Sequence, residues 1–159
     1  MKYERLTKEQ FEELHQEFIN FLAAQTITKE EWDKIKTEKP KVAEQELDVF
    51  SDLIWEGVLN NSQYLEHFSK EYIFLFKCEL NKVFSIVIHS LTKNIDFTTQ
   101  QGLIWLSDHI FTDEVEIQLG TKTITDERNT FLFDIIKQGA IISDGYIYNQ
   151  IDNILDKSK

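Results

Sequence analysis

The chain is poor in residues that interrupt or cross-link a fold. Its 159 residues include one proline, five glycines and one cysteine. So little proline and glycine argues against a disordered, collagen-like or turn-rich all-β chain. The single cysteine, Cys78, cannot form an intramolecular disulfide, which fits a reducing cytoplasm. Because it lies in an apolar stretch, we interpret it as a buried structural residue, with a catalytic thiol as the alternative.

Long apolar runs are also missing. The longest candidate, residues 83–91, is far shorter than the roughly 18–20 residues that cross a bilayer. The first residues are charged almost throughout, so we expect no secretory signal. The formal net charge of −11 opposes binding to nucleic acid and to anionic lipid. These features predict a soluble, cytoplasmic protein without nucleic-acid or membrane partners, which meets at most a basic protein.

Recognisable catalytic and cofactor motifs are absent from the sequence. The glycines match neither a phosphate-binding loop nor a dinucleotide fingerprint, and no Gly-x-Ser-x-Gly elbow occurs. Glu12 and His15 form one Glu-x-x-His pair, whereas di-iron bundles need two such pairs. His67, His89 and His109 show no ligand spacing. We therefore expect no cofactor, no metal site and no catalytic residue, with a carboxylate-bound metal enzyme as the minor alternative.

The hydrophobic pattern predicts a single α+β domain over residues 1–159, helical over about 1–70 and mixed over about 71–159. Thr7 with Gln10 and Thr28 with Glu31 are typical capping boxes, which mark two helix starts. The helices of the first part are expected at about 7–25, 28–39 and 40–61, with a short helical turn within 62–70.

The second part is expected to hold a small sheet in roughly β-β-α-β-α order with a C-terminal helix. Residues 70–91 are rich in β-branched and aromatic residues and predict a hairpin, although one long helix also fits their spacing. The further elements are a helix opened by Thr98, a strand over 114–119 ended by Gly120, a helix from Asp126 to Gly139, a short strand at 140–142 and a last helix after Gly145.

An acidic stripe runs along the predicted helix of residues 40–61. Glu44, Asp48, Asp52 and Glu56 recur every four residues and therefore share one helix face. Acidic neighbours at this spacing repel each other and lower helix stability, so the stripe needs a reason, and the candidates are a charged partner, solubility or no role at all. Trp55 falls among these carboxylates. It is either covered by the rest of the domain or forms a hot spot for a partner.

Three short sequence patterns carry a resemblance to a known family. They are Met1-Lys2-Tyr3 with Arg5-Leu6-Thr7-Lys8, the run from Ala43 through Phe50, Ser51 and Asp52 to Trp55-Glu56, and Gln138-Gly139-Ala140 with Ser143 and Gly145. With these patterns the chain resembles an uncharacterised bacterial (Bacteroidetes-type) family, a domain of unknown function of about this length. The resemblance implies a stand-alone, cytoplasmic, single-domain protein and supplies no activity or functional residue.

The leading functional hypothesis is a non-enzymatic cytoplasmic protein-binding domain. Its partner face would be the acidic, tryptophan-containing helix surface made of Glu44, Asp48, Asp52, Trp55 and Glu56. The alternative is an inhibitor or immunity-type protein that neutralises a basic partner, because small size and strong acidity both suit that role.

Overall fold

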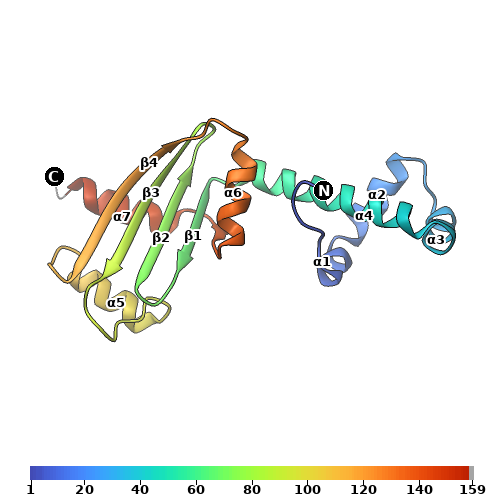
Figure 1. Cartoon of the computed structure of the whole chain (residues 1–159). Helices are drawn as coiled ribbons and strands as arrows, with labels where there is room; N and C mark the ends of the chain where they lie inside the picture. The colour runs from blue at the N-terminus through green and yellow to red at the C-terminus, as the bar shows by residue number, and fades with distance from the viewer. Residues whose placement is uncertain (158–159) are drawn as a thin grey trace. The chain divides into compact units, whose positions relative to one another are not determined.

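The structure, a computed structural model, describes residues 1–157 and is an α+β fold as predicted (Figure 1). The chain divides into two compact units, residues 1–60 and the part from Asn61 onward. The elements in chain order are α1 (Lys8–Glu13), α2 (His15–Ala24), α3 (Lys29–Glu38), α4 (Pro40–Asn61), β1 (Tyr64–Phe68), β2 (Tyr72–Cys78), β3 (Lys82–Ser90), α5 (Gln100–His109), β4 (Val115–Thr123), α6 (Arg128–Lys137), β5 (Ile141–Ser143) and α7 (Tyr146–Lys157).

The first unit is a small helical bundle built on aromatic side chains. Phe50 of α4 is almost fully buried and contacts Phe18, with ring centroids 5.0 Å apart, and Phe21 at 5.3 Å. Trp32 of α3 packs edge-on against Phe18. Both predicted capping boxes are formed, at Thr7 and at Thr28, so the local sequence set both helix starts.

The single helix predicted over 7–25 is two helices. Leu14 departs from helical geometry with φ −100° and ψ 23°, and it separates α1 from α2. The break leaves both Phe11 and Phe18 in contact with Phe50, at ring distances of 5.9 and 5.0 Å. Neither proline nor glycine marks this site, so the sequence carries no local signal for the break.

The second unit is built on a five-stranded antiparallel sheet in the order β4-β3-β2-β1-β5. Strands β2 and β3 form the predicted hairpin, so the long-helix alternative for residues 70–91 is wrong. The helical turn expected within 62–70 is also wrong, because these residues form β1, which pairs with β2. Five residues are too few to establish a helical period, and the sheet supplies the backbone partners of β1.

Helices α5 and α7 cover one face of the sheet, and both lie behind it in the view of Figure 1. The side chains between these helices and the sheet form the main core of this unit. Its buried members are Ile73, Leu75, Ile86, Ile88, Phe97, Leu106, Ile110, Val115, Tyr148 and Ile151. Removing these side chains from water supplies the main stabilising free energy of the unit.

Strand β4 extends beyond its predicted end. Gly120 does not stop it, and pairing with β3 continues to Thr123. Gly120 lies opposite Ser85, and a Cβ at this position would come within 2.7 Å of the Ser85 hydroxyl. The glycine therefore permits a close approach of two strands, and it is not a strand terminator.

Two helices begin one or two residues away from their predicted starts. Thr99, rather than Thr98, caps α5 by accepting a hydrogen bond from the Gly102 N–H, and α6 begins at Arg128 after Glu127.

Within residues 1–157, no helix combines the length and apolar character needed to cross a membrane. The prediction of a single domain stays a prediction, since each unit is compact by itself.

Candidate functional site

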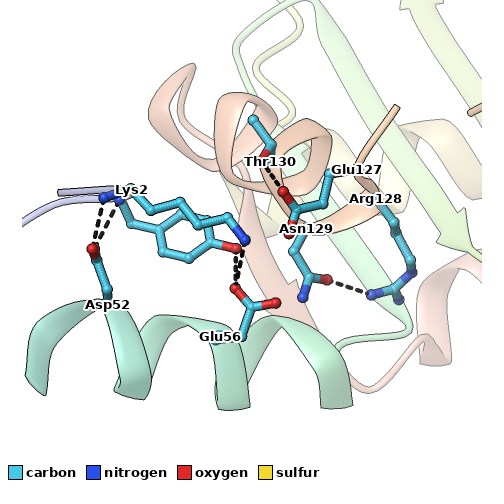
Figure 2. Close-up of polar contacts among 8 residues, drawn as sticks. Lys2, Asp52, Glu56, Glu127, Arg128, Asn129 and Thr130 are labelled. Carbon is cyan, nitrogen blue, oxygen red and sulfur yellow. Dashed lines mark hydrogen bonds and ion pairs between the residues drawn. The ribbon is translucent and has the colours of Figure 1, made fainter. Parts of the chain in front are cut away.

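The first residues of the chain form hydrogen bonds with the acidic face of α4. The Asp52 carboxylate accepts hydrogen bonds from the backbone N–H groups of Lys2, at 2.6 Å, and Tyr3, at 2.9 Å. Figure 2 shows Lys2 extended along the helix between Asp52 and Glu56. Each of the two carboxylate oxygens of Asp52 thus receives one backbone donor, and such charge-assisted bonds are stronger than neutral ones.

The same segment contacts α4 one helical turn to either side of Asp52. Glu56 accepts from the Lys2 ammonium, at 3.1 Å, and from the Tyr3 hydroxyl. Arg5 donates from Nε to Asp48 at 2.6 Å. We call residues 2–6 the N-terminal segment. Its donors thus meet three carboxylates that lie one helical turn apart along α4.

The electrostatics of this contact explain the acidic stripe. Burial, together with the hydrogen bond to Glu56, raises the pKa of Tyr3 to about 12. The hydrogen bond to Asp48 raises the pKa of the Arg5 guanidinium, and Glu44 adds to the effect. The basic groups and backbone donors of residues 2–6 therefore offset the repulsion between the α4 carboxylates.

The structure thus assigns the five predicted site residues different environments. Asp48, Asp52 and Glu56 converge on the N-terminal segment, Glu44 is exposed nearby, and Trp55 is half-buried. The stripe has an intramolecular role that the sequence analysis missed. The available signal was the basic pair of residues 2 and 5 just before the first capping box. A partner face on α4 stays a prediction.

A second surface lies on the sheet face opposite α5 and α7. Four rings form a continuous row there, which we call the ring row: His67, Phe74, Tyr72 and His89. The centroids of Tyr72 and His89 are 4.1 Å apart with the rings nearly parallel, and Tyr72 stacks on Phe74 at 5.6 Å. Phe74 lies 5.8 Å from His67. Neighbouring strands place these side chains together because their register pairs 67 with 74 and 72 with 89.

Helix α6 lies against part of this face, close to His67 and Phe76. A pocket of about 230 Å³ lies where the helix meets the ring row, lined by His67, Phe74, Phe76, Ile135, Gln138 and Ala140. Gly139 has a positive φ of 118°, and a Cβ there would come within 3.0 Å of the His67 ring. The glycine therefore lets the chain after α6 pass close over His67.

The rest of the ring row is accessible. Tyr72 is 36% exposed, and Phe74 and His89 are half-buried. A flat, partly exposed series of aromatic and imidazole rings can stack on planar groups or take a cation over a ring face. From the sequence, Tyr72 and Phe74 were strand residues and the two histidines were isolated. Only the strand register brings the four side chains together.

Arg128, at the start of α6, joins that helix to the sheet. Its guanidinium donates to the carbonyl oxygens of Ser62, Cys78 and Glu79. It also donates to the Asn129 side chain, as Figure 2 shows. The five N–H donors of a guanidinium lie in one plane on three nitrogens, so they reach several separated acceptors, whereas the three donors of a lysine all share one nitrogen.

Cys78 is buried, as predicted, and burial raises the pKa of its thiol to about 11. Its thiol is therefore protonated at neutral pH, unlike an activated cysteine nucleophile. Over residues 1–157, no group of three or more histidine, cysteine, aspartate or glutamate side chains is arranged to hold a metal ion.

Comparison with known proteins assigns a family and nothing more. The model of a family of unknown function, DUF6495, matches residues 1–156, so the chain belongs to that family. No curated protein matches the chain, and no solved structure does.

Proposed function

We propose that this member of DUF6495 is a non-enzymatic, cytoplasmic protein-binding domain that holds an arginine-bearing segment of a basic partner on its ring row. The observation that carries the proposal is the stacked series from His67 to His89 on an accessible sheet face. The cytoplasmic location is part of the proposal and rests on the lone, buried cysteine.

The chemistry of the row favours arginine. A guanidinium is planar, always charged and weakly hydrated, so it stacks on aromatic rings more readily than an ammonium does. Contacts of this kind are worth about 0.5–1 kcal/mol each at exposed sites. The net charge of −11 would attract a basic partner over a longer range and speed its association.

The ring row is preferred over the acidic face of α4 for a physical reason. The carboxylates of Asp48, Asp52 and Glu56 already receive residues 2–6. A partner on α4 would have to displace that segment and replace its hydrogen bonds. A partner on the ring row would not have to replace those hydrogen bonds, so its binding would avoid that cost.

Titration with a defined peptide tests this proposal. An arginine-rich peptide and a copy with citrulline in place of arginine differ in charge but share the planar end group. We expect the arginine peptide to shift the amide NMR signals of residues 67, 72, 74 and 89, and the citrulline peptide to bind about tenfold more weakly. The Tyr72→Ser variant should bind the arginine peptide about two- to fivefold more weakly, since it removes one such contact.

Leu80→Ser is the matched control, because Leu80 is 87% exposed in the β2–β3 turn. This variant should bind the peptide like the wild type. Shifts confined to α4 would move the site to Glu44, Asp48, Asp52, Trp55 and Glu56. Equal binding by wild type and Tyr72→Ser would overturn the ring-row proposal.

An inhibitor or immunity-type role is the second candidate. The observation that favours it is that α4 already binds a basic segment, since Lys2 donates to Glu56 and Arg5 donates to Asp48. A basic toxin encoded next to this gene, and inhibited by the purified protein, would support that role. Housekeeping neighbours would oppose it.

A further inference from the structure

Strand β4 forms one edge of the sheet. Over residues 1–157, β4 is hydrogen-bonded to β3 on one side only, and all nine of its residues belong to this edge. An edge of this length presents a row of backbone donors and acceptors to any strand that can pair with it. Leu119, at the centre of β4, is 61% exposed.

The hydrogen-bonding pattern shows which backbone groups of β4 point away from β3. Leu91 N–H donates to Glu114 O, and Ile124 N–H donates to Asn81 O, both at 2.8 Å. Hydrogen-bonded and non-hydrogen-bonded pairs alternate along an antiparallel ladder. The backbone N–H and C=O groups of the even-numbered residues of β4 therefore point toward β3. The backbone groups of Ile117, Leu119 and Thr121 therefore point away from the sheet. Val115 already donates to Thr112 O at 3.3 Å, so the outward pattern is cleanest in the centre and second half of β4.

We propose that two copies of this chain pair their β4 strands antiparallel about a two-fold axis at Leu119, which joins the two sheets into one. This register overlaps the whole of β4, because Val115 then lies opposite Thr123 of the second copy. Leu119 meets its own counterpart. The outward-facing backbone groups of residues 117, 119 and 121 then bond to one another, as an antiparallel pair requires.

Charge complementarity selects the same register. With Leu119 at the axis, Glu116 lies directly opposite Lys122 of the second copy, and symmetry repeats the pair. Both side chains are exposed on the sheet face that carries the ring row. Directly opposed charges of opposite sign stabilise an antiparallel pair, and like charges destabilise it. A shift of the axis by one residue in either direction separates Glu116 from Lys122.

The existing contacts of these two residues are compatible with this pairing. Glu116 accepts from the Gln118 side chain at 2.9 Å through one carboxylate oxygen, which leaves its second oxygen for an ammonium. Lys122 lies 4.6 Å from the Phe131 ring, a contact that does not use its three N–H donors in direct hydrogen bonds. The dimer pairs β4 strands and uses none of the four rings, although Glu116 lies opposite His89 of the ring row in the β3–β4 register. The dimer therefore does not depend on the proposed function.

A charge exchange across the axis tests the register. Sedimentation velocity of the full chain over a wide concentration range should show a reversible dimer. Glu116→Lys and Lys122→Glu should each raise the dimer Kd about tenfold, because each turns both cross-strand pairs repulsive. The double variant should restore the wild-type Kd, and an equimolar mixture of the two single variants should dimerise more tightly than either alone.

The central contact has its own test. Leu119→Lys places two ammonium groups at the axis and should abolish the dimer, while Leu80→Lys makes the same change at an exposed turn and should preserve it. Circular dichroism checks that both variants are folded. A wild-type chain that stays monomeric would overturn the proposal. So would a dimer unaffected by Leu119→Lys, or a double variant no tighter than the single ones.

Discussion

Asp52 and Lys2 are joined by a 2.6 Å hydrogen bond between a helix carboxylate and a backbone N–H fifty positions earlier in the chain. The Tyr3 N–H donates to the second oxygen of the same carboxylate. Asp52 is thus the central anchor of the N-terminal segment on α4, and the acidic stripe is largely explained by contacts within the first unit.

The Asp52→Ala variant tests this role. We expect a loss of about 1–3 kcal/mol in the free energy of unfolding, because two charge-assisted hydrogen bonds disappear. Asp52→Asn keeps one oxygen acceptor and should lose less. Urea denaturation measures the difference, and Glu44→Ala, at an exposed position on the same stripe, should change stability by about 0.5 kcal/mol or less. Equal stabilities of Asp52→Ala and Glu44→Ala would contradict the assignment.

The free energy of unfolding of the first unit should fall at alkaline pH because Tyr3 ionises. Its pKa is raised to about 12 in the folded protein, mainly by burial and then by the hydrogen bond to Glu56, against about 10 in an unfolded chain. A raised pKa means that the folded state holds the proton more tightly. The contribution of Tyr3 is therefore fully present below pH about 10 and is lost as the pH rises toward about 12.

Tyr3→Phe isolates this effect, since Tyr148 also has a pKa raised to about 12 and burial raises that of Cys78 to about 11. The stability difference between wild type and Tyr3→Phe should shrink over this alkaline range. Phenolate absorbance should show one late-titrating tyrosine fewer in the variant. A difference that stays constant from neutral to strongly alkaline pH would rule out the coupling.

Two glycines should respond in opposite directions to alanine. Gly145 has a φ of 82°, and a Cβ there would lie 2.4 Å from the Tyr64 ring, so Gly145→Ala should destabilise the protein by about 1 kcal/mol or more. Gly57 lies within α4, and a Cβ there would meet no atom within 4 Å. Gly57→Ala should therefore stabilise by about 0.5–1 kcal/mol. Thermal melts of the two variants measure both effects, and shifts of the same sign would contradict the prediction.

Local sequence signals predicted much of the fold. The capping boxes at Thr7 and Thr28 are formed because an N-cap residue and its partner lie three positions apart. Pro40 opens α4, and Gly139 ends α6 with a positive φ. The β2–β3 hairpin follows from β-branched and aromatic content around a short polar turn.

Other features had no adequate local signal. β1 is five residues long and pairs with β2 and β5, so its state depends on strands that follow it in the chain. The break at Leu14 depends on how Phe11 and Phe18 pack against Phe50. Short segments follow the contacts available to them when their own preference is weak.

The sequence alone determined that α4 carries an acidic stripe, because helical spacing places Glu44, Asp48, Asp52 and Glu56 on one face. It also supplied a basic N-terminal segment, but it left the two unconnected. The tertiary structure decided that they meet, as strand register decided that Tyr72 stacks on His89. Both contacts join residues distant in the chain, and only the folded backbone fixes the distances between them.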